Sequence, residues 1–315
     1  MWRVWTSILV ISTLVHADEA PRAGDGKEAP PGKPAVTTQP KAAKKPAKKK
    51  VESFLLRYEL ARGKRFIGSN TVSFNVKHTV RTGNKKEESE ESVERTERFR
   101  DHIKSSSSRG PVEIERQYQR LFTKVRDSER GRPDVDQNPL QGRTVFITER
   151  RRSRSIRAEK GLPVPTFVRK TVGIEIDWRD VLPRERVQVG DVWEADAEAF
   201  ARRLAPYLDS GTRVRMIVRF ESIEIRDGAR CAKFYVDMTI DGMRDRQLFT
   251  KAQLAGDAIF DMNLKRFVMI DLAGSFIVRG AILGKGLAKI IQAEGKASYK
   301  STLREVQVSA AAPSK

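Results

Sequence analysis

The chain has few of the residues on which disulfide scaffolds and metal centres depend. Its 315 residues include one cysteine and three histidines. A disulfide within one chain is therefore excluded, and a zinc site built from cysteine and histidine has almost no ligands to draw on. Apolar residues make up 39% of the chain and aromatic residues 7%, which suffices for a hydrophobic core. We expect no metal ion and no cofactor.

Long apolar runs are also scarce. The main apolar segment lies at the N-terminus, where Arg3 precedes a run from Val4 to Val15 that ends in the small-residue pattern Val15-His16-Ala17. A bilayer-spanning helix needs roughly 20 apolar residues, and this run is shorter. The pattern predicts a signal peptide over residues 1–17, cleaved after Ala17, and a secreted or periplasmic protein. An uncleaved membrane anchor is the alternative.

Acidic residues are outnumbered, 41 to 61, so the formal net charge is +20. Residues 18–50 are rich in proline, alanine and lysine, and such a composition buries too little apolar surface to become ordered. We predict a disordered linker there and a short disordered tail at residues 311–315. The linker lysines fit either a cationic arm on an anionic envelope surface or a solvated tether.

Alternating apolar residues predict strands over most of residues 51–310, which we expect to form a single β-rich domain. The first five predicted strands lie near residues 54–60, 72–80, 87–104, 112–122 and 145–157. The charged 87–104 segment would also suit an exposed helix. We favour a strand because turn signals flank it.

The second half begins with a different pattern and then returns to strands. Residues 178–182 fit one helical turn, and the apolar spacing of Ala197–Leu208 predicts an amphipathic helix. Beyond it, Asp227-Gly228 and Asp241-Gly242 mark hairpin turns, and Gly274 marks a bulge. Short turns require antiparallel pairing. The predicted fold is mainly β: a long-stranded, strongly curved antiparallel sheet, or half-barrel, packed on one or two helices.

Three short patterns resemble those of uncharacterised secreted bacterial β-rich proteins, whose architecture is similar to the half-barrel of periplasmic lipoprotein carriers. The patterns are Leu182-Pro183 followed by Val189-Gly190-Asp191-Val192-Trp193-Glu194; Asp227-Gly228 followed by Cys231-Ala232; and Leu254-Ala255-Gly256 leading to Phe260-Asp261, Arg266 and Ile270-Asp271-Leu272. The resemblance implies a fold and a compartment. It implies no catalytic residues, because the family has no established activity.

The sequence offers no clear candidates for catalytic residues. A hairpin that turns near residues 83–84 would pair His78 with a residue near Ser89, so a metal or proton relay shared with His102 is not expected. Cys231 follows a turn with no histidine positioned beside it, and we interpret it as a core residue. We predict no catalytic residues and no enzymatic activity, with an unrecognised hydrolase as the least favoured alternative.

An arginine-rich segment is the strongest local feature. On one strand, alternate arginines would project in a row that suits phosphates, sulfates or carboxylates. The alternative is an edge strand kept soluble by its charge. The predicted polyanion-binding residues are Arg150, Arg151, Arg152, Arg154 and Arg157.

The leading functional hypothesis is a non-catalytic extracytoplasmic binding or scaffold protein that holds an apolar or amphiphilic ligand on a concave sheet face. The candidate residues for that face are Phe74, Phe122, Phe220, Phe234 and Phe260. The alternative is an envelope-associated polyanion binder that uses the linker lysines and the arginine-rich segment. Expected partners are an amphiphile, a lipid headgroup or an acidic glycan, with peripheral membrane contact; we expect no nucleic acid, and the oligomeric state is left open.

Overall fold

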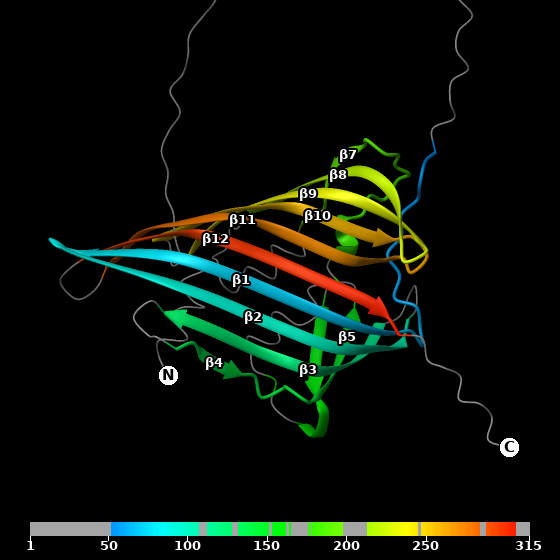
Figure 1. The fold of residues 1–315 in the computed structure, drawn as a ribbon, viewed down its shortest axis with the longest axis horizontal. Helices are drawn as coiled ribbons and strands as arrows, with labels where there is room; N and C mark the ends of the chain where they lie inside the picture. Colours follow the sequence, from blue (N-terminus) through cyan, green and yellow to red (C-terminus); the bar gives the residue numbers. More distant parts are fainter. Residues whose placement is uncertain are drawn as a thin grey trace, which may run out of the picture. The chain divides into compact units, whose positions relative to one another are not determined.

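A computed structural model describes residues 52–106, 112–127, 132–150, 153–161, 164, 176, 178–197, 213–244, 247–283 and 288–306. Its main element is one sheet of 12 strands (Figure 1). The strands are β1 (Arg65–Thr82), β2 (Lys85–Ser105), β3 (Val112–Asp127), β4 (Asp134–Gln137), β5 (Thr144–Arg150), β6 (Ser153–Ala158), β7 (Val192–Glu194), β8 (Arg213–Arg226), β9 (Ala229–Arg244), β10 (Leu248–Asp261), β11 (Arg266–Leu283) and β12 (Ala288–Glu305).

The strand order is β6-β5-β3-β2-β1-β12-β11-β10-β9-β8-β7, with β4 beside β3. All of these pairings are antiparallel. The first and last long strands, β1 and β12, pair at the centre, whereas β6 and β7 form two open edges. The predicted antiparallel sheet is therefore confirmed.

The helices that the structure describes with defined bounds are few and short. Within the described ranges the helical elements with defined bounds are two short 3-10 helices, η1 (Glu159–Gly161) and η2 (Trp178–Val181). The second of these confirms the helical turn predicted at residues 178–182. Almost all of the predicted Ala197–Leu208 helix lies outside the described residues, so packing of the sheet on a helix is not shown.

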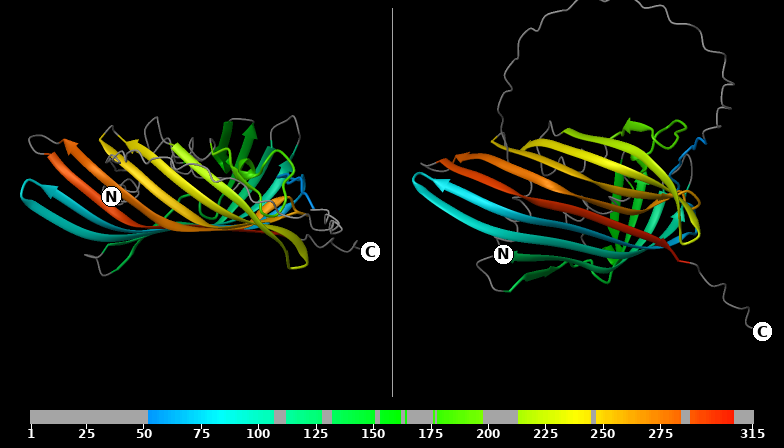
Figure 2. Two further views of the ribbon diagram at one scale, coloured as in Figure 1. Left: turned by 90° about the horizontal axis from the view of Figure 1, so that it is seen from above. Right: turned by 45° about the horizontal axis from the view of Figure 1, so that its top comes forward.

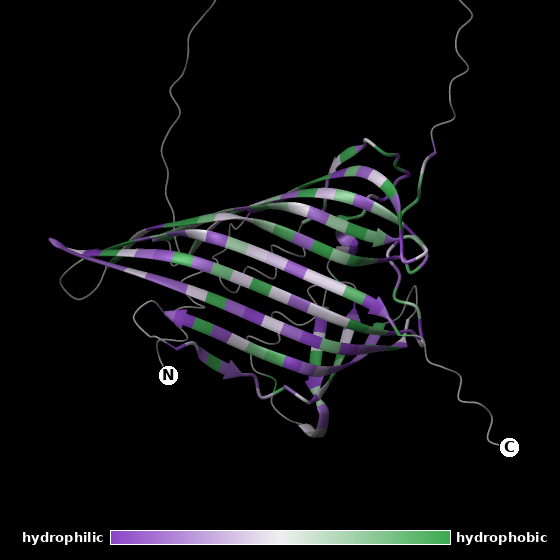
Figure 3. Cartoon of the chain, in the orientation of Figure 1, coloured by the Kyte–Doolittle hydropathy of each residue, from purple (hydrophilic) through white to green (hydrophobic). Residues whose placement is uncertain are grey.

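The long strands alternate between hydrophilic and hydrophobic residues, and the sheet bends along its strands (Figures 2 and 3). The pleat sends every second side chain to one face, the inner face, which carries the buried residues. One apolar row crosses six strands of this face in register: Val214, Ile240, Ala252, Phe276, Gly295 and Val76.

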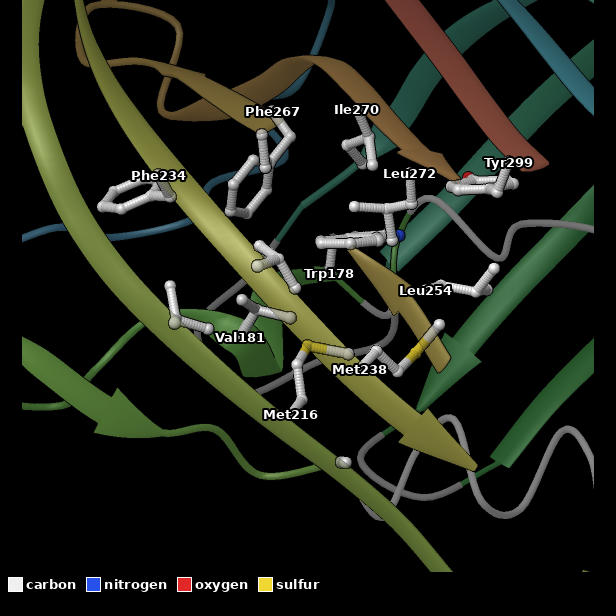
Figure 4. Close-up of a cluster of buried hydrophobic side chains, with 14 of the residues drawn as sticks. Trp178, Val181, Met216, Phe234, Met238, Leu254, Phe267, Ile270, Leu272 and Tyr299 are labelled. Atoms are coloured by element: carbon white, nitrogen blue, oxygen red, sulfur yellow. The ribbon is translucent and has the colours of Figure 1, made fainter. Parts of the chain in front are cut away.

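Two hydrophobic clusters occupy the inner face. The larger one joins strands β8 to β12 and includes Phe220, Phe234 and Phe267, with Trp178 of η2 packed among them. Figure 4 shows Trp178 beside Leu272 and Tyr299. The smaller cluster lies on β2, β3, β5 and β6 and includes Phe99 and Tyr118.

Buried polar residues lie between the two clusters. Ser301, Asn70 and Glu97 stand in register on β12, β1 and β2. All three are buried, and the Ser301 hydroxyl donates to Asn70 Oδ1 at 2.8 Å. The inner face is thus two apolar surfaces separated by a polar seam.

Several local predictions are confirmed. Residues 87–104 belong to strand β2 and not to a helix, and His78 pairs with Ser89. Asp227 and Gly228 form the β8–β9 turn with φ values of 48° and 77°. These positive φ values are typical of the tight hairpin turns that Asp-Gly favours.

The predicted strand at residues 54–60 is wrong. Residues 52–60, here called the strap, form one isolated bridge between Phe54 and Val187 and no ladder. Phe54, Leu56 and Leu60 are nevertheless buried. The alternation therefore reflects an extended segment that packs its side chains on other parts of the protein without strand pairing.

Two further turn and bulge predictions are wrong. Asp241 and Gly242 lie inside β9, paired with Lys251 and Thr250. Gly274 stays in register between Leu254 and Ala297. A Cβ atom at Gly274 would lie 1.8 Å from the backbone oxygen of Gln253, so glycine permits a close approach of strands there instead of a bulge.

Candidate functional site

A cavity of about 460 Å³ is the candidate site. Three segments line it: strap residues 56–58, residues 179–184 of η2 and the turn after it, and residues 193–196 of β7 and its continuation. These segments are far apart in the sequence and meet at the edge of the sheet that β7 forms.

The strap forms one wall. Its backbone exchanges two hydrogen bonds between Phe54 and Val187, at 2.7 and 2.8 Å, and Glu59 N donates to Lys265 O at 2.9 Å. The ring of Phe54 packs edge-on against Phe220, with 5.7 Å between centroids. These contacts fix the strap at both ends and place Tyr58 between them.

The second wall is η2. Trp178 stacks on Tyr299, with centroids 6.3 Å apart and an angle of 4° between the planes, and it meets Phe267 edge-on. The next residue, Arg179, points to a different partner: its NH2 donates to Glu149 Oε1 at 3.0 Å. Buried Trp178 thus anchors η2 in the larger cluster while Arg179 lines the cavity.

The third wall depends on Trp193. Its Nε1 donates to Val181 O at 2.9 Å, and its ring packs edge-on against Phe234. A turn aims the chain in this direction, because Gly190 has φ of 98° and the Asp191 side chain accepts from Gln188 N at 2.9 Å. The turn thus directs Trp193 toward the larger cluster.

The charges in the lining are three arginines and three acids, and the ion pairs decide which remain available. Glu194 pairs with Arg215 outside the cavity at 3.2 Å, and Arg179 pairs with Glu149 and, at 3.4 Å, with Asp180. Within the described part of the chain, Arg57 and Arg184 have neither an ion pair nor a side-chain hydrogen bond. Asp196 is not free either, so the lining charges without a partner are positive.

An apolar surface accompanies this charge. Tyr58, Leu182 and Trp193 line the cavity and pack against the larger cluster. Two free guanidiniums beside such a surface suit a ligand that has an anionic group and an apolar part.

The predicted arginine row has a different geometry. Residues 145–157 form a hairpin of β5 and β6, with Arg150 opposite Ser153 and Arg154 opposite Glu149, so the single strand that the row required is wrong. Arg151 and Arg152 lie outside the described residues. Arg157 is exposed, with its guanidinium 5.6 Å from the Phe146 ring centroid.

Arg154 is not free to bind a polyanion by itself. Its Nε donates to Glu149 Oε2 at 2.5 Å, and Glu149 also accepts from Arg179 of the cavity. The predicted segment is thus connected to the cavity through one carboxylate. A binding role for the exposed arginines stays a prediction.

The five phenylalanines predicted for a concave face do not form one surface. Phe220, Phe234 and Phe260 are at most 1% exposed inside the larger cluster. Phe74 is half-buried at the margin of that cluster, edge-on to Phe276. Phe122 alternates with buried Leu121 and so faces the other side of the sheet.

The remaining candidates agree with a structural interpretation. His78 lies 3.7 Å from Glu91, and His102 stands opposite Arg65, so the two histidines are separate. Cys231 is 1% exposed, and burial, followed by the charges of Asp261 and Glu224, raises the pKa of its thiol. Within the described ranges no group of three or more His, Cys, Asp and Glu side chains has an arrangement that would hold a metal ion.

Most of the cavity has no signal in the sequence. Arg57 and Arg184 stand in no motif, and no periodic signal marks them. The first of the three sequence patterns supplies Leu182, Pro183, Trp193 and Glu194 to the lining, but it implied a fold and a compartment and no site. In the part of the chain that the structure describes, no helix combines the length and apolar character needed to cross a membrane.

Comparison with known proteins adds little to this geometry. No family model matches the chain, and no curated protein matches it. Among solved structures, an outer membrane channel from Pseudomonas putida F1 is similar at a TM-score of 0.26 and 9% identity, with 79% of this chain and 98% of that chain covered. The β-rich architecture is shown, and the resemblance to secreted half-barrel proteins stays a prediction.

Proposed function

We propose that the protein is a non-catalytic extracytoplasmic binding protein that holds a small anionic amphiphile in the cavity between the strap, η2 and β7. The observation that carries the proposal is the pair of unpaired arginines, Arg57 and Arg184, beside the apolar wall of Tyr58, Leu182 and Trp193. The extracytoplasmic location rests on the sequence of residues 1–17.

The chemistry of the cavity sets the ligand class. Guanidinium groups bind carboxylates and phosphates through paired hydrogen bonds, which a neutral lipid cannot accept in the same way. An apolar tail adds about 0.8 kcal/mol for each buried methylene, so affinity should rise about fourfold per carbon until the cavity is full.

The test is titration calorimetry with hexanoate, octanoate and decanoate, with decanol as the uncharged probe. We expect saturable binding that strengthens with chain length, and tighter binding of decanoate than of decanol. Decyl phosphate in a parallel titration distinguishes a phosphate ligand from a carboxylate ligand.

Charge variants separate the site from net charge. The double variant Arg57→Gln/Arg184→Gln should weaken decanoate binding about tenfold, equal to about 1.4 kcal/mol. The control Arg100→Gln/Arg126→Gln removes the same charge from exposed residues that alternate with buried Phe99 and Val125. Equal losses in both variants, or no saturable binding to the wild type, would contradict the proposal.

Polyanion binding by the arginine-rich hairpin has weaker support. Arg154 is paired with Glu149, so Arg150 and Arg157 are the described members of the set that stay exposed. A long polyanion would have to be held by the hairpin with one of its arginines already neutralised.

A further inference from the structure

The guanidinium of Arg266, at the start of β11, is buried and has no hydrogen-bond partner in the described part of the chain. The residue is 1% exposed, and among the described residues none accepts a hydrogen bond from its Nε, NH1 or NH2 atoms. Its guanidinium lies 4.2 Å from the ring centroid of Phe66 and 5.7 Å from that of Tyr58. The guanidinium therefore contacts two aromatic rings, and no carboxylate among the described residues pairs with it.

The acid that stands directly opposite Arg266 on the neighbouring strand does not form an ion pair with it within the described residues. Asp261 stands opposite Arg266 on β10. Its Oδ1 accepts from the backbone N atoms of Asn263 and Leu264, each at 2.8 Å, and so caps the β10–β11 turn. No ion pair joins Asp261 to Arg266 within the described chain.

Arg116, another buried arginine of the same sheet, has the carboxylate partner that Arg266 lacks among the described residues. Arg116 is 0% exposed and lies 3.6 Å from the Phe99 ring centroid, and it also donates two hydrogen bonds to Asp101, at 2.8 and 2.7 Å. Arg266 has the aromatic contacts but no carboxylate. Ring contacts offset only part of the cost of removing a guanidinium from water.

We propose that Arg266 is the interior anchor for the anionic group of the ligand. This inference rests on the proposed function and adds one residue, Arg266, and one step, the binding of the anion in the interior after it has entered the cavity. Tyr58 contributes to the cavity wall and also stands over the guanidinium of Arg266. Arg266 does not line the cavity itself, so the anion would reach its guanidinium when the Tyr58 side chain moves aside, while the strap backbone keeps its hydrogen bonds to Val187 and Lys265.

The ligand group that fits is a carboxylate or a phosphate, because both accept paired hydrogen bonds from one guanidinium. Arg57 and Arg184 would attract the anion at the cavity, and Arg266 would bind it after it leaves water. Removal of one partner from a buried ion pair costs more binding free energy than removal of an exposed charge. Substitution of Arg266 should therefore weaken binding of the anion more than substitution of Arg57 or Arg184.

The experiment measures decanoate and decanol binding to the full chain by calorimetry. Arg266→Gln should weaken decanoate at least about 30-fold while it changes decanol binding little. Decyl phosphate tests the same variant with the second anion. The matched control is Arg116→Met, which removes a buried arginine that already has its carboxylate.

A second measurement needs no ligand. If Arg266 lacks its partner in the free protein, Arg266→Met should unfold at the same or higher urea concentration than the wild type, whereas Arg116→Met should unfold at a lower one. Loss of stability in Arg266→Met equal to that in Arg116→Met would refute the anchor and indicate a structural cation.

The two proposals fail in different ways. Wild-type binding of decanoate that Arg266→Gln leaves unchanged would overturn the anchor and leave the binding function intact. Absence of binding of every probe to the wild type would overturn the proposed function, and the anchor with it.

Discussion

The buried pair of Arg116 and Asp101 offers the sharpest test of how this sheet holds charge. Arg116 Nε and NH2 donate to the two carboxylate oxygens at 2.8 and 2.7 Å, and both side chains are at most 1% exposed. Three variants form the perturbation: Asp101→Asn, Arg116→Met, and the apolar double variant Asp101→Leu/Arg116→Met.

The expected magnitudes follow from burial. Removal of one partner breaks a doubly hydrogen-bonded ion pair between two buried side chains, which costs about 3–5 kcal/mol. Asp101→Asn would remove the carboxylate that accepts both hydrogen bonds from Arg116. The double variant leaves no buried charge, so we expect it to lie within about 1 kcal/mol of the wild type, well short of the sum of the single losses.

Urea unfolding followed by circular dichroism is the assay, with the midpoint and the m-value compared across the series. For a domain of this size a loss of 3–5 kcal/mol corresponds to a fall in Tm of about 6–20 °C. An Asp101→Asn loss below about 1 kcal/mol, or a double variant equal to the sum of the singles, would refute the reasoning that this pair is desolvated and coupled.

Three further predictions concern single residues. Gly274→Ala should lower the free energy of unfolding in urea by about 3 kcal/mol, because its Cβ would lie 1.8 Å from a neighbouring backbone oxygen. The control Gly63→Ala, at a position with φ of 82° and nothing within 4 Å, should lower it by only about 1 kcal/mol. Equal losses in the two variants would contradict the close approach of strands at Gly274. The raised pKa of the buried Cys231 thiol predicts no reaction with a disulfide reagent at pH 8 until urea is added, so rapid labelling of native protein would disprove it. Burial, and then the charge of Lys104, lowers the pKa of His102 below its unfolded value. Its contribution to stability is therefore present above about pH 6.5 and is lost as the pH falls. The variant His102→Gln should lose less stability than the wild type between pH 7 and pH 5.5, and parallel losses would show that other groups are responsible.

Much of the sheet could be predicted because long strands repeat the two-residue period many times. Strand β1 shows the alternation of Val72, Phe74 and Val76, and the Asp227-Gly228 turn marks a hairpin by its backbone chemistry. Even the pairing of His78 with Ser89 followed from the turn position alone. Local sequence signals were therefore sufficient to predict the long strands and the hairpin turns that contain them.

The errors arose where a turn or a bulge leaves no local signal. The β5–β6 connection at residues 151–152 is Arg-Arg, and neither residue favours a turn, so two strands looked like one. A bulge between Arg98 and Phe99 shifts the register with β3, and this places Phe122 on the face opposite to Tyr118. Alternation alone cannot locate such a shift.

The candidate site could not be predicted for a different reason. Its walls come from the strap, η2 and β7, and the meeting of these segments depends on tertiary packing, such as Phe54 on Phe220 and Trp178 on Tyr299. No sequence pattern predicts the burial of Arg266. Only the folded arrangement shows that this arginine is buried and that Asp261, opposite to it, accepts hydrogen bonds from the backbone of the turn.

The surroundings of the unpaired arginines favour a small amphiphile over a polymer. In the arginine-rich hairpin, Glu149 neutralises Arg154 and also holds Arg179, so part of the basic surplus is satisfied inside the protein. Arginines without a carboxylate partner among the described residues occur in both places: Arg57 and Arg184 line the cavity, and Arg150 and Arg157 lie on the hairpin. At the cavity these charges stand beside the apolar wall of Tyr58, Leu182 and Trp193, which the tail of an amphiphile can contact. Net charge alone would favour both ligands equally, so the apolar wall decides between them.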